Sequence, residues 1–266
     1  MAASSEPRRR RVAGSVLAVL ALVACSPAAA ADPDALWTIV HSQCVPDQQS
    51  NGDPAPCALV DVAAGEPRGY AVLKDLVGAT QFLLIPTERV AGIESQQVLA
   101  PDAPNYFAAA WDARSFVEQR AGRALPRDWV SLAVNSADAR SQNQLHIHID
   151  CVRADVRQAL TAHAGDIATT WQPFPVALAG QQYRAMAVWD DELTAENPLR
   201  LLADGLPAAE SMGAQSLVVV GNTGADGRPG FVLLAGRADA GRPGSGHGED
   251  LQDHVACPPP AEVLGK

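Results

Sequence analysis

The stretch that most constrains the fold of this chain is Gln144-Leu145-His146-Ile147-His148-Ile149-Asp150. Polar and apolar residues alternate without exception along it. A period of two predicts a β-strand, so Gln144, His146 and His148 should project from one face of a sheet while the aliphatic residues face the core. The chain has six histidines, and two of them lie side by side on a strand that is otherwise suited to burial. This placement indicates a chemical role.

The first 31 residues are typical of a targeting segment rather than of a folded domain. Arg8–Arg11 form a basic region, and Val12–Val23 is apolar. Leu22–Cys25 resembles a bacterial lipobox, in which Cys25 would be lipidated. Cleavage after the small residues 28–30, or an uncut apolar segment that weakly spans the bilayer, are the alternatives. Each places the body of the protein on the extracytoplasmic side, and we favour attachment to the cell inner membrane.

Four further cysteines, Cys44, Cys57, Cys151 and Cys257, follow that segment. An even number outside the cytoplasm is typical of disulfides, and four cysteines allow three pairings. We expect Cys44–Cys57 as a short clip around a turn-rich segment, and Cys151–Cys257 as a link from the tail to the histidine strand. Buried free thiols are the alternative, and a cysteine metal site is disfavoured because no Cys-x-x-Cys spacing occurs.

The charge of the chain restricts its partners. The formal net charge is −10 at neutral pH, and no basic stripe with interleaved aromatic residues occurs. Proteins that bind nucleic acid need such a cationic surface for the phosphates, so we expect no nucleic-acid partner. An anionic substrate would have to be held by a few local donors.

The roughly 235 residues beyond the targeting segment are enough for one large domain or two small ones. The first half should contain a helix from Ala35, a polar turn-rich stretch over 46–56, and a long helix over 105–121. Two strand pairs are expected around that long helix, at 70–73 with 81–85 and at 130–134 with 145–149.

The C-terminal half repeats this pattern. A helix is predicted over 192–203, strands over 216–220 and 230–234, and a surface loop over 239–250. A degenerate duplication would explain the repetition, and so would chance, because short apolar strands resemble one another. The second strand pair has no histidine.

Two motifs together resemble the histidine-triad superfamily. Gln144–Ile149 resembles its His-φ-His-φ-His-φ motif, with Gln144 in place of the first histidine. Ala79–Pro86 resembles the superfamily's threonine, histidine and aliphatic strand that ends in proline, with Gln81 in place of the histidine. The order of hairpin, long helix, strand and triad strand also agrees.

Within that superfamily the chain resembles the bacterial CDP-diacylglycerol pyrophosphatases. The shared features are an exported N-terminus, the Leu36-Trp37 opening followed by Cys44, a triad that runs into Cys151, and the Leu251–His254 tail that leads to Cys257. The resemblance covers nearly everything after the targeting segment.

The resemblance implies an α+β fold with a HIT-like antiparallel sheet flanked by helices. It divides the chain into a signal or anchor segment over 1–31, a catalytic domain over 32–175, and a C-terminal α+β part over 176–266 that packs on it. Histidine-triad proteins are often dimers, so we expect either a homodimer or an internal pseudo-dimer in which the C-terminal extension is a degenerate second copy.

The resemblance also assigns chemical roles. His146 would attack the α-phosphorus of a nucleotide and form a nucleotidyl-histidine, which requires a neutral imidazole whose other ring nitrogen is held by an acceptor. His148 would donate to a phosphate oxygen as charge shifts in the transition state. Gln144 can orient but cannot carry a proton. The reaction needs no metal and no cofactor.

The substrate contacts are assigned with less detail. Five further residues are candidates: Asn135 for the phosphates, Ser141 near the leaving group, Asp75 near the ribose, Arg140 as a cation for the pyrophosphate, and Gln81 from the second motif.

The resulting expectation is hydrolysis of CDP-diacylglycerol, held in the membrane, to CMP and phosphatidate. Other histidine-triad hydrolases or transferases of nucleotides are the first alternative. A non-catalytic envelope lipoprotein is the second, because a decaying active site loses histidines and glutamines stand at 81 and 144. His146 and His148 could also be half of a zinc site, or a structural pair that faces solvent.

Overall fold

The computed structural model describes Met1 and residues 32–258. The expectations for the targeting segment, including lipidation of Cys25, fall on residues outside this range. Residues 32–258 belong to one compact unit. No helix within the described part of the chain is long and apolar enough to cross a membrane.

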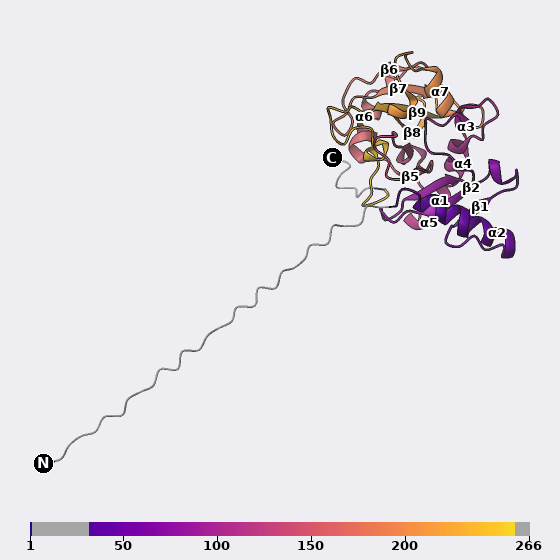
Figure 1. Cartoon of the computed structure of the whole chain (residues 1–266). Coiled ribbons are helices and arrows are strands. Elements are labelled where there is room, and N and C mark those ends of the chain that lie inside the picture. Colours follow the sequence, from indigo (N-terminus) through magenta and orange to yellow (C-terminus); the bar gives the residue numbers. More distant parts are fainter. Residues whose placement is uncertain (2–31, 259–266) are drawn as a thin grey trace. The chain divides into compact units, whose positions relative to one another are not determined.

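A nine-stranded sheet organises this unit, and every pair of neighbouring strands is antiparallel. The strand order is β1-β2-β3-β5-β4-β8-β9-β7-β6. Figure 1 shows β1 and β2 toward one end of the sheet and β7 and β6 toward the other. The sheet and its helices confirm the expected α+β class. The strands are β1 Leu59–Asp61, β2 Tyr70–Lys74, β3 Phe82–Pro86, β4 Val130–Val134, β5 Ile147–Cys151, β6 Gln172–Pro173, β7 Arg184–Val188, β8 Gln215–Thr223 and β9 Pro229–Arg237.

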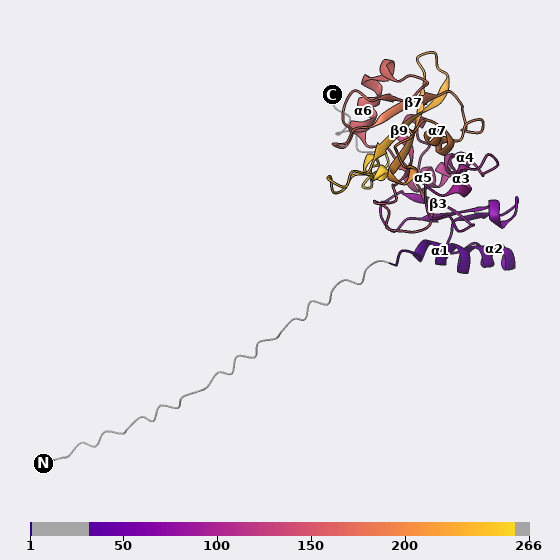
Figure 2. The same ribbon diagram turned by 45° about the horizontal axis from the view of Figure 1, so that its top comes forward.

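Helices cover both faces of the sheet. Leu83 and Ile85 of β3 pack in a small apolar cluster with the N-terminal helical segment, whereas Phe82 and Leu84 belong to the main core with α4. Figure 2 shows α1 and α2 on one side of β3 and α4 and α5 on the other. The helices are α1 Ala35–Ile39, a π-helical turn Val40–Cys44, α2 Val45–Asn51, α3 Gln96–Leu99, α4 Tyr106–Asp112, α5 Arg114–Ala121, α6 Ala154–Ala162 and α7 Pro198–Asp204.

Two disulfides tie loops to this frame, and they join the cysteines in the expected pairs. Cys44–Cys57 links the π-helical turn to the segment before β1. Cys151–Cys257 links the end of β5 to the C-terminal tail across 106 positions. The second disulfide holds the tail against the strand that carries the histidines.

The strand register decides which face carries the histidines. His148 of β5 lies opposite Leu83 of β3 and Ala133 of β4, so its side chain projects on the same face as theirs. Ile147 and Ile149 point to the other face and pack in the main core. The predicted division of this strand into a core face and a polar face is therefore confirmed.

Several predicted boundaries are wrong for local reasons. The helix expected over 105–121 is two helices that meet at Ala113. The helix expected from residue 192 begins only at Pro198, where Asn197 accepts from the Leu199 N–H and proline fixes a helical φ. The stretch 46–56 is helical as far as Asn51, because Pro46 lies in the first turn of α2, where its missing N–H is tolerated.

The strand β5 begins at Ile147, two residues later than predicted. Its partner β3 ends at Pro86, which has no N–H to continue the ladder. Just before β5, the Leu145 N–H donates to Val90 O instead.

The sheet is continuous along the whole unit. β4 pairs with β8 from Ser131 opposite Val220 to Val134 opposite Leu217. β6, which lies before residue 175, pairs with β7, which lies after it. The two parts expected from the sequence therefore share one sheet.

Candidate active site

His146 lies just before β5 and is 7% exposed. Its Nδ1 lies 2.7 Å from the main-chain oxygen of Gln144. A carbonyl oxygen only accepts, so Nδ1 carries the proton and Nε2 carries the lone pair. Burial, together with the charge of neighbouring His148, lowers the pKa of His146 to about 4. His146 is therefore neutral near pH 7 and presents a free imidazole nitrogen.

His148 lies next to it on the same face. The two ring centroids are 4.9 Å apart and the planes are inclined by 67°. Nδ1 of His148 lies 2.9 Å from Gln81 Nε2, 3.5 Å from Glu249 Oε2 and 3.7 Å from Asp75 Oδ2. Its Nε2 is buried and has no hydrogen-bond partner within the described residues. One ring nitrogen is thus held by the protein, and the other is left for a bound group.

The two carboxylates beside His148 are both ionised more readily than usual. Burial acts to raise the pKa of Asp75, but the contact with His148 and the Val77 N–H outweigh it and lower that pKa. Burial likewise acts to raise the pKa of Glu249, but the charge of His148 and the bond from Asn135 lower it. The site therefore carries negative charge beside His148 at neutral pH.

Gln81 reaches His148 from the start of β3 and is completely buried. Its amide nitrogen also lies 3.4 Å from Oε1 of Gln252. The Gln252 amide in turn donates to Ser131 O, Ser131 Oγ and His148 O at 3.1, 3.1 and 3.2 Å. Gln252 thus connects β4, β5 and Gln81 through one buried side chain.

Asn135, at the end of β4, contacts Glu249 in both directions. Its Nδ2 donates to Glu249 Oε1 at 2.7 Å, and its Oδ1 accepts from the Glu249 N–H at 3.3 Å. Glu249 lies in a short 3-10 turn, Gly248–Leu251, near the end of the chain. The loop over 239–250 predicted to be a mobile surface element therefore delivers a carboxylate to the site.

The Gln144 side chain turns away from the two histidines. Its Nε2 donates to Pro86 O at 3.0 Å and to Glu88 O at 2.9 Å, and its Oε1 accepts from the Val90 N–H at 3.3 Å. The side chain therefore fixes the segment after β3. Only the main-chain carbonyl of Gln144 touches His146.

The remaining predicted contacts lie in the loop between β4 and β5. Arg140 forms an ion pair with Glu94 at 2.8 Å and lines a small cavity of about 10 Å³ together with His146 and Asn135. Ser141 is exposed, and no hydrogen bond of its side chain is formed with the described residues. Arg140 thus lies beside His146, while Ser141 lies at the surface.

Asp150 occupies the next position on the histidine face. It is completely buried, and its Oδ1 accepts from Thr80 Oγ1 at 2.7 Å and from the Cys151 N–H at 2.9 Å. Burial outweighs these bonds and raises its pKa to about 6. The alternation of the strand predicted that Asp150 lies on this face. Its complete burial and raised pKa were not predicted.

Glu249 and Gln252 are the other residues that sequence reasoning missed. Gln252 belongs to the tail that contributes to the family resemblance. The resemblance marked this tail as relevant but assigned no role to Gln252. Glu249 stands in a Gly-rich, charged segment that looks like any exposed loop. Within the residues that the structure describes, no three His, Cys, Asp or Glu side chains are arranged to hold a metal ion.

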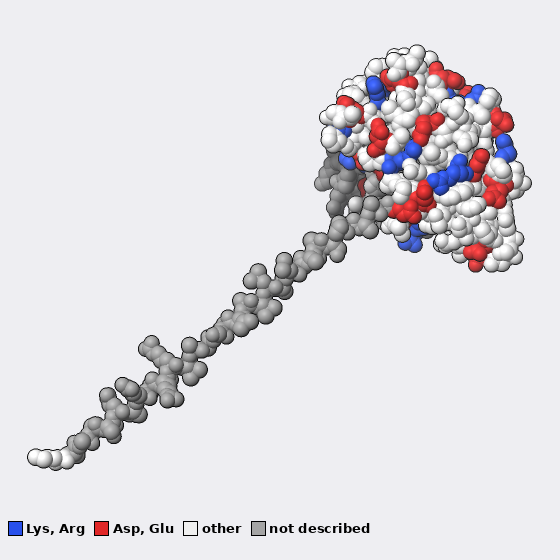
Figure 3. All heavy atoms as spheres, viewed as in Figure 1, with Lys and Arg blue, Asp and Glu red and all other residues white. Residues whose placement is uncertain are grey.

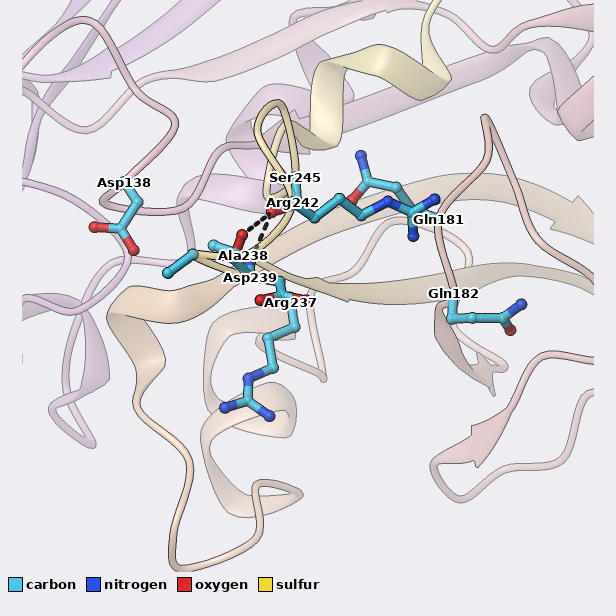
Figure 4. A pocket seen from close by; sticks show the side chains of 9 residues that line it. Asp138, Gln181, Gln182, Arg237, Ala238, Asp239, Arg242 and Ser245 are labelled. Atoms are coloured by element: carbon cyan, nitrogen blue, oxygen red, sulfur yellow. Dashed lines mark hydrogen bonds between the residues drawn. The ribbon is translucent and has the colours of Figure 1, made fainter.

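A wider pocket than the small cavity beside His146 lies elsewhere in the described structure. This open pocket of about 650 Å³ is lined by charged and polar side chains, among them Arg237, Arg242 and the hydrogen-bonded pair Asp239 and Ser245 (Figure 4). None of the site histidines lines it. Acidic and basic side chains are interspersed on the face shown in Figure 3.

Comparison with known proteins gives one consistent result. A family model described as CDP-diacylglycerol pyrophosphatase matches residues 31–258. The chain is also 43% identical over 223 residues to a CDP-diacylglycerol pyrophosphatase of Yersinia pestis, a match that covers 84% of this chain and 83% of the relative.

Proposed function

The chain belongs to the CDP-diacylglycerol pyrophosphatase family, and we propose that it hydrolyses CDP-diacylglycerol to CMP and phosphatidate through a nucleotidyl-histidine. The observation that carries the mechanism is the bond between His146 Nδ1 and Gln144 O. It directs the proton to Nδ1, so the unshared pair is at Nε2, the nitrogen that must attack phosphorus.

In the first step, Nε2 of His146 attacks the phosphorus that carries the cytidine. A P–N bond forms, the bridging P–O bond breaks, and phosphatidate leaves with the bridging oxygen. The Gln144 carbonyl stabilises the positive charge that develops on the ring, because it accepts from Nδ1–H. The low pKa of His146 keeps the attacking imidazole unprotonated at neutral pH.

His148 acts on the phosphates in this proposal. In the neutral ring, Nδ1 accepts from the Gln81 amide and the proton is on Nε2, which is unpartnered in the described part of the chain. That N–H donates to a phosphate oxygen as negative charge moves toward the leaving group. Arg140, which lines the cavity beside His146, supplies a cation close to the pyrophosphate.

In the second step, a water molecule attacks the phosphorus of the intermediate. The P–N bond breaks, its electron pair returns to Nε2 of His146, and CMP leaves with the water oxygen. The proton released from water passes to solvent or to the phosphate that is formed. Asn135 and Glu249, joined by two hydrogen bonds, place polar groups on the side of the site where Asn135 and His146 line the same cavity.

We further propose that the sheet is of the histidine-triad type and is an internal pseudo-dimer. The order strand, helix, strand, strand occurs as β3, α4–α5, β4, β5 and again as β7, α7, β8, β9. The strand orders β3-β5-β4 and β8-β9-β7 mirror each other across the antiparallel β4–β8 pair, as two-fold symmetry requires. β9 has no histidine, so the second copy is structural.

The proposed location is the extracytoplasmic side of the inner membrane, with the N-terminal segment as the anchor. Two disulfides support this location, because such bonds persist in oxidising compartments and are rare in the cytosol. An anchored body would meet a substrate whose acyl chains remain in the bilayer.

One experiment tests the mechanism directly. The full chain is incubated with CDP-diacylglycerol labelled in the CMP moiety and quenched rapidly, and the labelled peptide is identified. Label on His146, lost in His146→Ala together with turnover, is the expected result. Near-normal turnover by His146→Ala would refute the mechanism.

A substrate panel separates the alternative functions. Dinucleoside polyphosphates and nucleoside phosphoramidates are offered in parallel with CDP-diacylglycerol. Preference for either soluble substrate would indicate a different histidine-triad activity. Inertness toward all three would favour a non-catalytic envelope protein.

A further inference from the structure

Three aliphatic side chains beside the active site have no covering partner in the described structure. Leu76 is fully exposed, Val255 is 85% exposed and Val77 is 63% exposed. Apart from Met1, the other large hydrophobic residues exposed within residues 32–258 are Val176 and Trp189, which are each 36% exposed. The three residues, called the docking rim below, are thus the most exposed apolar side chains of the described body.

The docking rim belongs to two loops that touch each other. Leu76 and Val77 lie between β2 and β3, and Val255 lies in the C-terminal tail. The Ala79 N–H of the first loop donates to the main-chain oxygen of His254 in the second at 3.2 Å. Residues 179 positions apart, Leu76 and Val255, are therefore brought to neighbouring loops by the fold.

Both loops also contact His148. Asp75, next to Leu76, places Oδ2 at 3.7 Å from His148 Nδ1. Gln252, three residues before Val255, donates to His148 O at 3.2 Å. Asp75 thus links the first loop to the His148 ring, and Gln252 links the tail to the His148 main chain, so both loops of the docking rim lie next to this residue of the site.

Hydrogen bonds hold the two loops in shape. Lys74 Nζ donates to Asp75 O and Gly78 O at 2.7 and 2.9 Å, and Arg120 Nε donates to Ala79 O at 3.2 Å. In the tail, Asp253 Oδ1 accepts from the Val255 N–H at 2.9 Å. The exposed aliphatic groups are therefore presented by fixed backbone rather than by frayed chain.

We propose that the docking rim inserts into the surface of a lipid bilayer and so brings the active site to membrane-held CDP-diacylglycerol. This inference rests on the proposed function, because the two acyl chains of that substrate stay in the bilayer while its phosphates must reach His146. Insertion into a bilayer would remove the three aliphatic side chains from water, and it would do so beside the site that must receive the phosphates of the lipid. Lys74 and Arg120, bound to the first loop, bring cations close to lipid phosphates.

The first test compares two forms of the substrate. The full-length triple variant Leu76→Ser/Val77→Ser/Val255→Ser is assayed on long-chain CDP-diacylglycerol in phosphatidylcholine vesicles and on a short-chain, monomeric CDP-diacylglycerol. We expect at least about a tenfold loss on vesicles, from three unburied aliphatic side chains, and unchanged turnover of the monomeric substrate. Val176→Ser, an exposed valine beyond β6, is the matched control and should change neither rate.

The outcomes of this test are distinct. Equal rates of the triple variant and the parent on vesicles would overturn the proposal. An equal loss on both substrates would also overturn it, because docking cannot affect a monomeric substrate.

A second test does not depend on activity. Leu76→Trp in the full chain is mixed with vesicles that contain a brominated phosphatidylcholine, and the quenched fluorescence is compared with that of the parent. Extra quenching is expected for Leu76→Trp and none for Val176→Trp. Absence of extra quenching, or a concentration-dependent blue shift without vesicles that indicates burial by a second copy, would refute bilayer docking. Quenching in a chain that does not hydrolyse CDP-diacylglycerol would support docking and refute only the proposed function.

Discussion

Gln81 and His148, 67 positions apart in the chain, meet at 2.9 Å between the amide nitrogen and Nδ1. In the neutral form of His148 the amide N–H donates to Nδ1, and the ring proton is on Nε2. A glutamine thus fixes the ring without competing for its proton. In this chain the orienting group of His148 is the side chain of Gln81, whereas that of His146 is a main-chain carbonyl.

The first prediction concerns Gln81. Gln81→Leu removes the donor that fixes the His148 tautomer and should lower kcat by about 10- to 100-fold, with a smaller change in KM. Steady-state kinetics on monomeric CDP-diacylglycerol provide the measurement. Thermal unfolding of the same variant is the control, and an unchanged kcat in a folded protein would contradict the assigned role.

The second prediction concerns Gln252. Gln252→Leu leaves Ser131 O, Ser131 Oγ and His148 O without their shared donor in a buried site. We expect the free energy of unfolding to fall by about 1–3 kcal/mol, because buried polar groups lose a partner. Urea denaturation measures this change. A positioning role further predicts that kcat falls while KM for the monomeric substrate is retained, and a loss of stability alone would leave Gln252 purely structural.

The third prediction concerns the pH dependence that His146 imposes. Its pKa is about 4 in the folded protein against 6.5 for an ordinary histidine, so protonation favours the unfolded state. The corresponding stability is complete above pH 6.5 and is lost as the pH falls toward 4, by about 3 kcal/mol in all. NMR titration of the ring protons should show no protonation of His146 at pH 6. An observed pKa near 6.5 would contradict its burial as a neutral ring.

The fourth prediction concerns Asp150, whose effect has the opposite sign. Its pKa is raised from 3.8 to about 6, so deprotonation favours the unfolded state and stability is lost as the pH rises from about 4 to 6. Asp150→Asn removes this loss and should increase stability at pH 7 relative to the parent. Unfolding free energies of the parent and of Asp150→Asn at pH 4.5 and 7 measure the effect, and an identical difference at both pH values would refute it.

The fifth prediction compares the two disulfides. Cys151→Ala/Cys257→Ala opens a loop of 106 positions and Cys44→Ala/Cys57→Ala one of 13. Loop-closure entropy then predicts losses of about 5 and about 3 kcal/mol, respectively. Only the first pair holds the tail with Glu249 and Gln252, so only its removal should also reduce kcat under conditions where both variants are folded. An unchanged kcat in Cys151→Ala/Cys257→Ala would show that the tail is held without its disulfide, and an equal loss in both variants would contradict a specific role of this bond.

Local patterns accounted for much of this fold. Alternation over Gln144–Asp150 separated a core face from a polar face, and apolar runs located β2, β3, β4, β8 and β9 to within a few residues. These patterns gave wrong boundaries where a capping residue or a proline, rather than the hydrophobic period, sets the end of an element. The helix expected from residue 192 starts at Pro198, because the cap of Asn197 and the fixed φ of proline begin it there.

The candidate site was predictable only in part. His146, His148, Gln81, Asn135 and Asp75 are brought together as the resemblance implied. The direction of the Gln144 side chain was not predictable. Its amide bonds Pro86 and Glu88, which are more than 50 positions away in the chain.

The sequence by itself determined the face that carries the two histidines, because a side-chain period of two is a local property of the strand. The sequence also determined the family, because each motif that carries the resemblance is a continuous stretch of residues and can be recognised without the fold. Only the tertiary structure decided that Glu249 and Gln252 reach His148 and that Leu76 and Val255 lie on touching loops. Loops that are far apart in the chain meet only when the strands between them pair in one sheet. Local hydrophobic periodicity does not specify which strands pair, so it cannot predict these contacts.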